Sequence, residues 1–321
     1  MRGLSILRKA WSKRYNALGK KSSLIIIFSV TASLVIMSFT DIAFSSVTFN
    51  SSSLSRLYRV GEFTEKNNAE FSLASRESGG FFDDIKEADW WRLKERIENT
   101  PECSQNCNPE ESHFWYQNNW EPSFTCLHER RLGLWGDGGK WVCDPHRIAT
   151  SASKQGCLVY SVGSNNDFSF EEAVLRDIAG DCEIHTFDHT IGEAPSNLLV
   201  KGNVNFHPWG LARLDQAPNM KQMATIVREL GHEGREIDIF KIDCEGCEWE
   251  TVKSWFRSGA RIRQVLVEVH AGTTDAVPLP AMEFMSFMKQ QRYVIFHKEP
   301  NIAWSGGSCI EYAFVLLEGR G

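Results

Sequence analysis

The sequence predicts an α/β fold in which a doubly wound, mostly parallel sheet occupies the C-terminal half. From residue 156 onward, short runs rich in branched and aromatic residues alternate with helix-length segments, which is the pattern of strand–helix–strand units. One run, beginning at Ile237, stops abruptly in carboxylates around Gly246, as expected at the ligand-binding edge of a parallel sheet. The last two strand-like runs have no helix-length segment between them, which indicates an antiparallel hairpin at one edge.

The elements follow in chain order. The predicted strands are Leu158–Val162, Glu183–Phe187, Val204–Phe206, a run from Ile237, Ile262–Val269, Tyr293–Phe296 and Tyr312–Leu317. The predicted helices are Phe81–Glu98, Phe168–Ala179, Met220–Leu230, a segment ending at Phe256, and Pro280–Gln290. We assign residues 151–321 to the sheet domain and residues 81–150 to a Trp- and Cys-rich extension that packs on it.

The N-terminal region predicts a membrane anchor. Residues 1–21 carry seven Lys or Arg and no acid, and residues 22–44 are nearly continuous apolar sequence. About 20 apolar residues span a bilayer, and the basic flank stays in the cytosol. We therefore expect a single-pass type II membrane protein whose bulk lies in the Golgi or ER lumen or at the cell surface, beyond a flexible stem at residues 45–80. The alternative is a signal peptide cleaved at Ala43-Phe44-Ser45, which would make the protein secreted.

Charge and cysteine content limit the partners. The net charge of −6 disfavours general nucleic-acid binding, which needs clustered Lys and Arg, so we expect no nucleic-acid partner. Nine cysteines are too few for a disulfide scaffold. Cysteines beyond a membrane tend to pair, and we expect a disulfide between Cys126 and Cys143. A zinc site of Cys103, Cys107, His113 and Cys126 is the alternative, but the spacing fits no standard finger, so no metal is predicted.

The glycine-rich segment Gly136–Lys140 has two interpretations. It is either a tight turn or a loop that carries Asp137 and Lys140 over a ligand. The spacing of these residues does not decide between the two.

The first two strands of the sheet domain end in residues that indicate a nucleoside site. Gly163 follows the first strand, and Asp188 ends the second strand 25 residues later. A glycine turn lets the backbone approach a ligand, and the acid can bind both hydroxyls of a ribose. A plain strand–helix turn and a helix cap are the alternative explanations. A single glycine, without a Gly-x-x-x-x-Gly-Lys loop, disfavours a pyrophosphate, so a nucleoside such as S-adenosylmethionine fits better.

The segment after the fourth strand resembles a known signature. Asp243-Cys-Glu-Gly-Cys-Glu-Trp249 is similar to the Asp-x-Glu-Gly-x-Glu pattern of FkbM-type and related class I methyltransferases. Three upstream blocks, Glu129–Gly133, Gly136–Pro145 and Val159–Glu171, resemble the methyltransferase-like protein 24 family of membrane or secreted proteins. The resemblance covers about residues 124–317.

This resemblance implies a class I fold of seven strands that binds S-adenosylmethionine at the carboxyl ends of the first, second and fourth strands. Carried over position by position, the resemblance implies that Gly163, Ser164 and Asn165 form the turn after the first strand and that Asp188 binds the ribose. It implies that His207 and Gly210 border the adenine. Asp243 and Glu245 would lie near the methionine end of the cofactor and near the acceptor. The sequence departs from the family at Cys244 and Cys247, where aliphatic and small residues are usual.

Catalysis at such a site depends mostly on placement, because the methyl donor is already reactive. A base is required only if the acceptor is a hydroxyl. The candidates are Asp243, and Glu268 with His270 at the end of the fifth strand, although an ordinary polar strand end also explains the last two. We favour O-methylation of an acceptor that is a glycan, a protein or a small molecule.

Other functions fit parts of the pattern. Cys244 and Cys247 form a Cys-x-x-Cys motif at a strand-to-helix turn, as in thiol–disulfide oxidoreductases. The anchor, stem and luminal domain match the layout of Golgi glycosyltransferases, in which Asp243 and Glu245 would hold a divalent metal. A non-catalytic surface protein that keeps the methyltransferase fold is a third alternative.

Overall fold

The computed structural model describes residues 72–103, 112–193, 204–270, 279–306 and 309–318. Residues 64–321 form one compact unit, to which all of these residues belong. The predicted cytosolic tail (1–21) and membrane anchor (22–44) lie outside the described residues. Among the described helices, none has the length and apolar character needed to cross a membrane.

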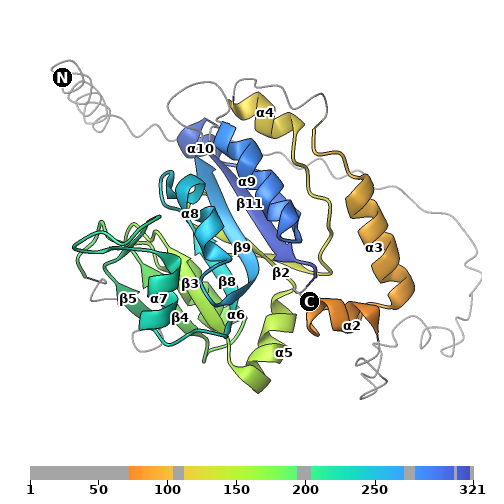
Figure 1. The fold of residues 1–321 in the computed structure, drawn as a ribbon, viewed down its shortest axis with the longest axis horizontal. Helices are drawn as coiled ribbons and strands as arrows, with labels where there is room; N and C mark the ends of the chain where they lie inside the picture. Colours follow the sequence, from red (N-terminus) through yellow and green to blue (C-terminus); the bar gives the residue numbers. More distant parts are fainter. Residues whose placement is uncertain (1–71, 104–111, 194–203, 271–278, 307–308, 319–321) are drawn as a thin grey trace, which may run out of the picture. The chain divides into compact units, whose positions relative to one another are not determined.

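A seven-stranded sheet forms the centre of this unit (Figure 1). Its strands are β3 (Leu158–Val162), β4 (Glu183–Phe187), β5 (Val204–His207), β8 (Glu236–Ile242), β9 (Arg261–His270), β10 (Tyr293–Pro300) and β11 (Cys309–Leu316), with the short helix α10 (Ile302–Ser305) between the last two. The spatial order is β10-β11-β9-β8-β3-β4-β5. Strands β5, β4, β3, β8 and β9 run parallel, whereas β11 is antiparallel to both β9 and β10. The predicted doubly wound sheet with an antiparallel hairpin at one edge is therefore confirmed.

Apolar cores cover both faces of the sheet, which explains why its central strands are rich in apolar residues at successive positions. The helices of the sheet domain are α6 (Ser169–Asp177), α7 (Met223–Glu229), α8 (Cys247–Trp255) and α9 (Leu279–Gln290). Helices α7, α8 and α9 contribute to one apolar core and α6 to the other. In β8, the adjacent residues Ile239 and Phe240 belong to opposite cores, so this central strand is buried on both sides.

The part of the chain before β3 contributes to both cores. It contains α2 (Leu73–Ser78), α3 (Glu87–Asn99), α4 (Ser112–Asn118), the hairpin of β1 (Glu129–Leu132) and β2 (Lys140–Cys143), and α5 (Pro145–Gln155). Trp115, Tyr116 and Trp120, in and after α4, belong to the core of α7, α8 and α9, whereas the buried side chains of α2, α3, β1, β2 and α5 belong to the core of α6. Gln264 of β9 fixes the hairpin to the sheet through two hydrogen bonds with the backbone of Cys143, of 2.9 and 2.7 Å. The predicted disulfide between Cys126 and Cys143 is confirmed, and a second disulfide, Cys157–Cys182, was not predicted.

Several elements differ from the predicted bounds. The helix predicted from Phe81 begins at Glu87, because residues 81–84 form a turn, and two further differences also have local reasons. Most of the predicted stem (45–80) lies outside the described residues, but Leu73–Ser78 form α2, which the side chain of Ser72 caps. The helix predicted from Met220 begins at Met223, because the short strand β7 (Met220–Lys221) pairs with β6 (Gly210–Leu211).

Candidate active site

The carboxyl ends of the parallel strands bring the predicted site residues to one edge of the sheet. Gly163 follows β3 and Asp243 follows β8, and the pairing of Val162 with Ile242 places them side by side. A Cβ atom on Gly163 would lie 1.7 Å from the backbone oxygen of Asp243, and the residue has a φ of +79°. The neighbouring strand and the left-handed backbone therefore require glycine here, independently of any ligand.

Asp188, directly after β4, organises the turn after β3. Its Oδ2 accepts hydrogen bonds from Ser164 N (2.9 Å), Ser164 Oγ (3.1 Å) and Asn165 N (2.8 Å). Its Oδ1 accepts two more, from Thr190 N (2.9 Å) and Thr190 Oγ1 (2.6 Å). Burial opposes ionisation, but the bonds from Thr190, Asn165 and Ser164 outweigh it and lower the pKa of Asp188 to about 2. The carboxylate thus shapes the turn, and its contact with a ribose stays a prediction.

His207, at the end of β5, belongs to an aromatic stack. The centroid of its ring lies 4.4 Å from that of Trp209 and 5.1 Å from that of Phe187, and its Nε2 hydrogen-bonds Nδ1 of His185 at 2.9 Å. Burial and the nearby His185 lower the pKa of His207 to about 4, so the ring is neutral at physiological pH. A Cβ atom on Gly210 would meet side-chain atoms 2.5 Å away. Protein atoms pack both residues, and their contact with adenine stays a prediction.

A buried lysine holds three carboxyl groups together at the centre of the site. The Nζ of Lys140 in β2 lies 2.5 Å from Glu311 Oε1, 3.3 Å from Asp243 Oδ2 and 3.7 Å from Glu268 Oε2. Lys140 is 2% exposed, and Asn301 donates a hydrogen bond of 3.0 Å to the other oxygen of Glu268. Lys140, which follows the glycine-rich segment, therefore places its ammonium group at the edge of the sheet.

The three carboxyl groups differ in protonation. Burial, followed by the charges of Glu311 and Asp243, raises the pKa of Glu268 to about 8, and burial also raises the pKa of Glu311. For Asp243, burial is outweighed by the charges of Lys140 and Lys241 and a hydrogen bond from Glu268, and its pKa falls to about 2. At neutral pH, Asp243 is therefore ionised, while Glu268 carries a proton and donates it in a hydrogen bond to Asp243.

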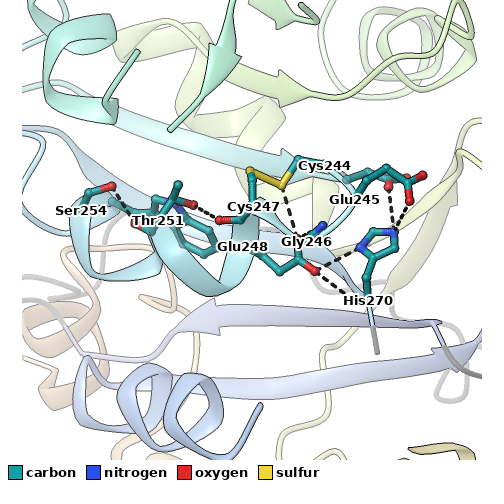
Figure 2. The surroundings of a disulfide bond; sticks show 10 residues. Cys244, Glu245, Gly246, Cys247, Glu248, Thr251, Ser254 and His270 are labelled. Atoms are coloured by element: carbon teal, nitrogen blue, oxygen red, sulfur yellow. Dashed lines mark hydrogen bonds and ion pairs between the residues drawn. A yellow bond between two sulfur atoms is a disulfide. The ribbon is translucent and has the colours of Figure 1, made fainter. Parts of the chain in front are cut away.

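Carboxylates keep His270, at the end of β9, in its cationic form (Figure 2). Its Nδ1 lies 3.0 Å from Oε1 of Glu248, a fully buried residue in the first turn of α8, and this oxygen also accepts from His270 N at 2.8 Å. Its Nε2 lies 3.7 Å from both Asp243 Oδ1 and Glu245 Oε2. Burial opposes protonation, but Glu248 and then Asp243 raise the pKa of His270 to about 9. A cation therefore lies beside the Asp243 carboxylate.

The end of β8 also offers groups that suit an amino-acid ligand. Lys241 is buried, and its Nζ donates to the backbone oxygen of Gly163 at 2.6 Å. An ammonium group has three donors, so Lys241 has further donors for an anion such as the carboxylate of a methionine moiety. The Gly163 oxygen and the Asp243 carboxylate are acceptors for the ammonium group of the same moiety. This donor set fits the amino-acid end of S-adenosylmethionine.

Asp243, Glu245 and His270 also offer three ligand atoms within 4.8 Å of one another. A metal ion there would need His270 to lose its proton, against the carboxylates that retain it. The expectation that no metal binds stays a prediction, which a chelator tests.

Some functional residues were not selected from the sequence. Lys241 and Glu311 each place a charge inside a largely apolar strand, and a charge at such a position is a recognisable sign of a site. Asn301 carries no such sign, because its contact with Glu268 depends on how the loop after β10 folds.

An α/β methyltransferase-like fold with an acidic site at the carboxyl ends of β8 and β9 defines the class of protein. A family model described as "Methyltransferase domain" matches residues 72–316, so the chain belongs to that family. The protein is an S-adenosylmethionine-dependent methyltransferase, and S-adenosylmethionine is its cofactor.

The chain is also similar to solved methyltransferase structures, at low sequence identity. A proposed rRNA methylase from Clostridium thermocellum is 11% identical with a TM-score of 0.36, over 54% of this chain and 94% of that one. The N-methyltransferase NodS from Bradyrhizobium japonicum is 9% identical with a TM-score of 0.33, over 54% and 92%. An O-methyltransferase from Bacillus cereus in complex with SAH is 12% identical with a TM-score of 0.34, over 53% and 80%. The comparison with curated proteins gives no match.

Proposed function

We propose that this enzyme methylates a hydroxyl group of a luminal or extracellular acceptor, as a membrane-anchored member of the methyltransferase-like protein 24 family. The chain of carboxyl groups from Asp243 through Glu268 to Glu311, held by Lys140, carries the proposal. A hydroxyl acceptor must lose a proton during transfer, and this chain is an acceptor for that proton.

Asp243 is the member of the chain that faces outward. Its side chain is 19% exposed, against 5% for Glu268, so Asp243 meets the acceptor and takes the hydroxyl proton. At neutral pH Glu268 donates a hydrogen bond to it. Above the Glu268 pKa of about 8, loss of that proton makes Asp243 a stronger base. His270, 3.7 Å from Asp243, stabilises negative charge on the acceptor oxygen.

The bound cofactor supplies an electrophilic methyl group. Lys241, the Gly163 oxygen and Asp243 would hold its amino-acid end, and the turn that Asp188 fixes would approach its nucleoside. Glu245 has a side chain that is 89% exposed, so it stands where an acceptor enters. Placement of the acceptor oxygen in line with the methyl group is the main contribution expected of the protein.

Two features support the proposed location. The disulfides Cys126–Cys143 and Cys157–Cys182 are buried within the core, and such bonds persist in oxidising compartments. The basic residues 1–21 before the apolar residues 22–44 favour a cytosolic tail and a single anchor. Protease protection of terminal tags in sealed vesicles tests this topology, and cleavage of the C-terminal tag from the cytosolic side would contradict it.

Incubation of the full-length protein in membranes with labelled S-adenosylmethionine tests the activity. The acceptors are separated glycan, protein, small-molecule and RNA fractions from cells. We expect label outside the RNA fraction, in an ether that withstands mild base. Label that mild base removes would indicate a carboxyl ester and contradict the hydroxyl acceptor. A chelator should leave the activity unchanged, because Lys140 already balances the carboxylates, and lost activity would favour a metal at Asp243.

A further inference from the structure

One disulfide differs from the other two whose cysteines are both described. The pairs Cys126–Cys143 and Cys157–Cys182 are at most 7% exposed and join residues 17 and 25 positions apart. The pair Cys244–Cys247 spans three positions in the turn between β8 and α8, and both cysteines are partly exposed. It closes a very small loop that a thiol in solution can reach.

The same turn carries the residues that hold the active-site charges (Figure 2). Glu245 has a φ of 56° and Gly246 a φ of 108°, so both are left-handed. Gly246 N donates to Glu248 Oε2 at 3.0 Å, and the other oxygen of Glu248 binds His270. Left-handed backbone at a residue such as Glu245 is costly unless its surroundings fix it. The disulfide flanks Glu245 and Gly246 on both sides, so it is the covalent constraint on this conformation.

We propose that Cys244–Cys247 is a redox-active site that exchanges with dithiols, and that its disulfide form keeps Glu245 and Glu248 in the geometry used for methyl transfer. The second part rests on the proposed function. Cys247 is the first residue of α8, where backbone N–H groups stabilise a leaving thiolate. A loop of three positions restricts the unfolded chain less than the longer loops do, so fold stability explains this bond least well.

The exchange balances in electrons and protons. One thiolate of the dithiol attacks a sulfur of the Cys244–Cys247 bond, forms a mixed disulfide and releases the other cysteine as a thiolate. The second thiolate of the dithiol then attacks the dithiol's other sulfur, which is bonded to a cysteine in the mixed disulfide. A disulfide forms within the dithiol, and the second cysteine leaves as a thiolate. Two electrons pass from the dithiol to the cysteines, and its two protons end on their thiols.

Charge around the turn selects the reductant. Four carboxylates lie in the turn and the first turn of α8. His270 pairs with three of them, and Lys140 pairs with Asp243 alone. These carboxylates are Asp243, Glu245, Glu248 and Glu250. They repel the thiolate of glutathione, which also carries carboxylates, more strongly than the thiolate of a dithiol that has no other charge. The site therefore suits a dithiol without carboxylates.

Differential alkylation of the full-length protein tests the exchange. The protein is treated with dithiothreitol or glutathione at equal thiol concentration, alkylated, and its cysteine peptides are measured by mass spectrometry. We expect alkylation of Cys244 and Cys247 to be roughly tenfold faster than that of Cys157 and Cys182, the buried internal control, and faster with dithiothreitol than with glutathione. Equal rates at the two disulfides would overturn the proposal.

The titration of His270, followed by NMR, is a readout that a purely structural disulfide would not change. Reduction should lower the pKa of His270 from about 9, because release of the turn displaces its partner Glu248. The double variant Cys244→Ser with Cys247→Ser should show the same lowering of the His270 pKa. If this variant does not fold, the measurement on the reduced wild type alone decides. An unchanged pKa in the reduced protein contradicts the second part. Neither measurement uses a methyl acceptor, so their failure is distinguishable from failure of the proposed function.

Discussion

Replacing Asp188 by Asn tests whether this acid shapes the cofactor turn or only contacts a ribose. The carboxylate accepts five hydrogen bonds, and its pKa falls from 3.8 to about 2. At roughly 1.4 kcal/mol per pKa unit, this shift corresponds to about 2 kcal/mol of folding free energy. Asn keeps one acceptor oxygen and turns an NH₂ group toward the donors on the other side. We expect Asp188→Asn to lower the free energy of unfolding at pH 7 by about 2 kcal/mol.

Urea denaturation followed by tryptophan fluorescence measures this loss, with the exposed acid Asp181→Asn as the matched control. The folded-state pKa of Asp188 is depressed, so its stabilisation is present above pH 3.8 and is lost as the pH falls toward about 2. The difference in the free energy of unfolding between the wild type and Asp188→Asn should therefore become smaller as the pH falls from 3.8 toward about 2. The affinity for S-adenosylmethionine, measured by calorimetry, should fall together with the stability. A variant as stable as the wild type that no longer binds the cofactor would refute the turn-shaping role.

Three other substitutions address the rest of the site. Lys140→Met removes the lysine that Asp243, Glu268 and Glu311 share, so the free energy of unfolding should fall by about 3 kcal/mol at pH 8. The loss should be smaller at pH 5, where the carboxyl groups take up protons. Urea denaturation at both pH values measures the two losses, and an equal loss at both would contradict this role. Glu268→Gln should remove the rise in activity through pH 8 that the raised pKa of about 8 predicts, and a rate–pH profile that keeps this rise would assign it to another group. Gly163→Ala should lower the melting temperature far more than Gly156→Ala, because both residues have a φ of +79° but only the first Cβ meets protein, 1.7 Å from Asp243.

The strands of the sheet could be predicted because they are buried on both faces, so their own composition marks them. The bounds of Leu158–Val162 and Glu183–Phe187 agree with the structure residue for residue. The true start of the helix that was predicted from Met220 could not be predicted from the sequence. It depends on the pairing of Met220–Lys221 with Gly210–Leu211, a contact between separate segments that the local periodicity of the sequence does not reveal.

The candidate site could be predicted in part for the same reason. Asp243, Glu268 and His270 converge because they stand at the ends of two adjacent parallel strands. The ion pair of Lys140 with Glu311 joins residues 171 positions apart and depends on the β1–β2 hairpin packing against the sheet. No local pattern in the sequence specifies such a contact, although Glu311 interrupts a largely apolar strand.

Methyl transfer by Asp243→Asn tests the proposed chemistry most directly. The full-length wild type and variant are incubated with labelled S-adenosylmethionine and the acceptor fraction, and cofactor binding is measured in parallel by calorimetry. We predict that the variant binds the cofactor within roughly tenfold of the wild type. We also predict that it transfers the methyl group at least about 100-fold more slowly, because it lacks the base that faces the acceptor. Transfer at the wild-type rate would contradict the assignment of Asp243 as that base.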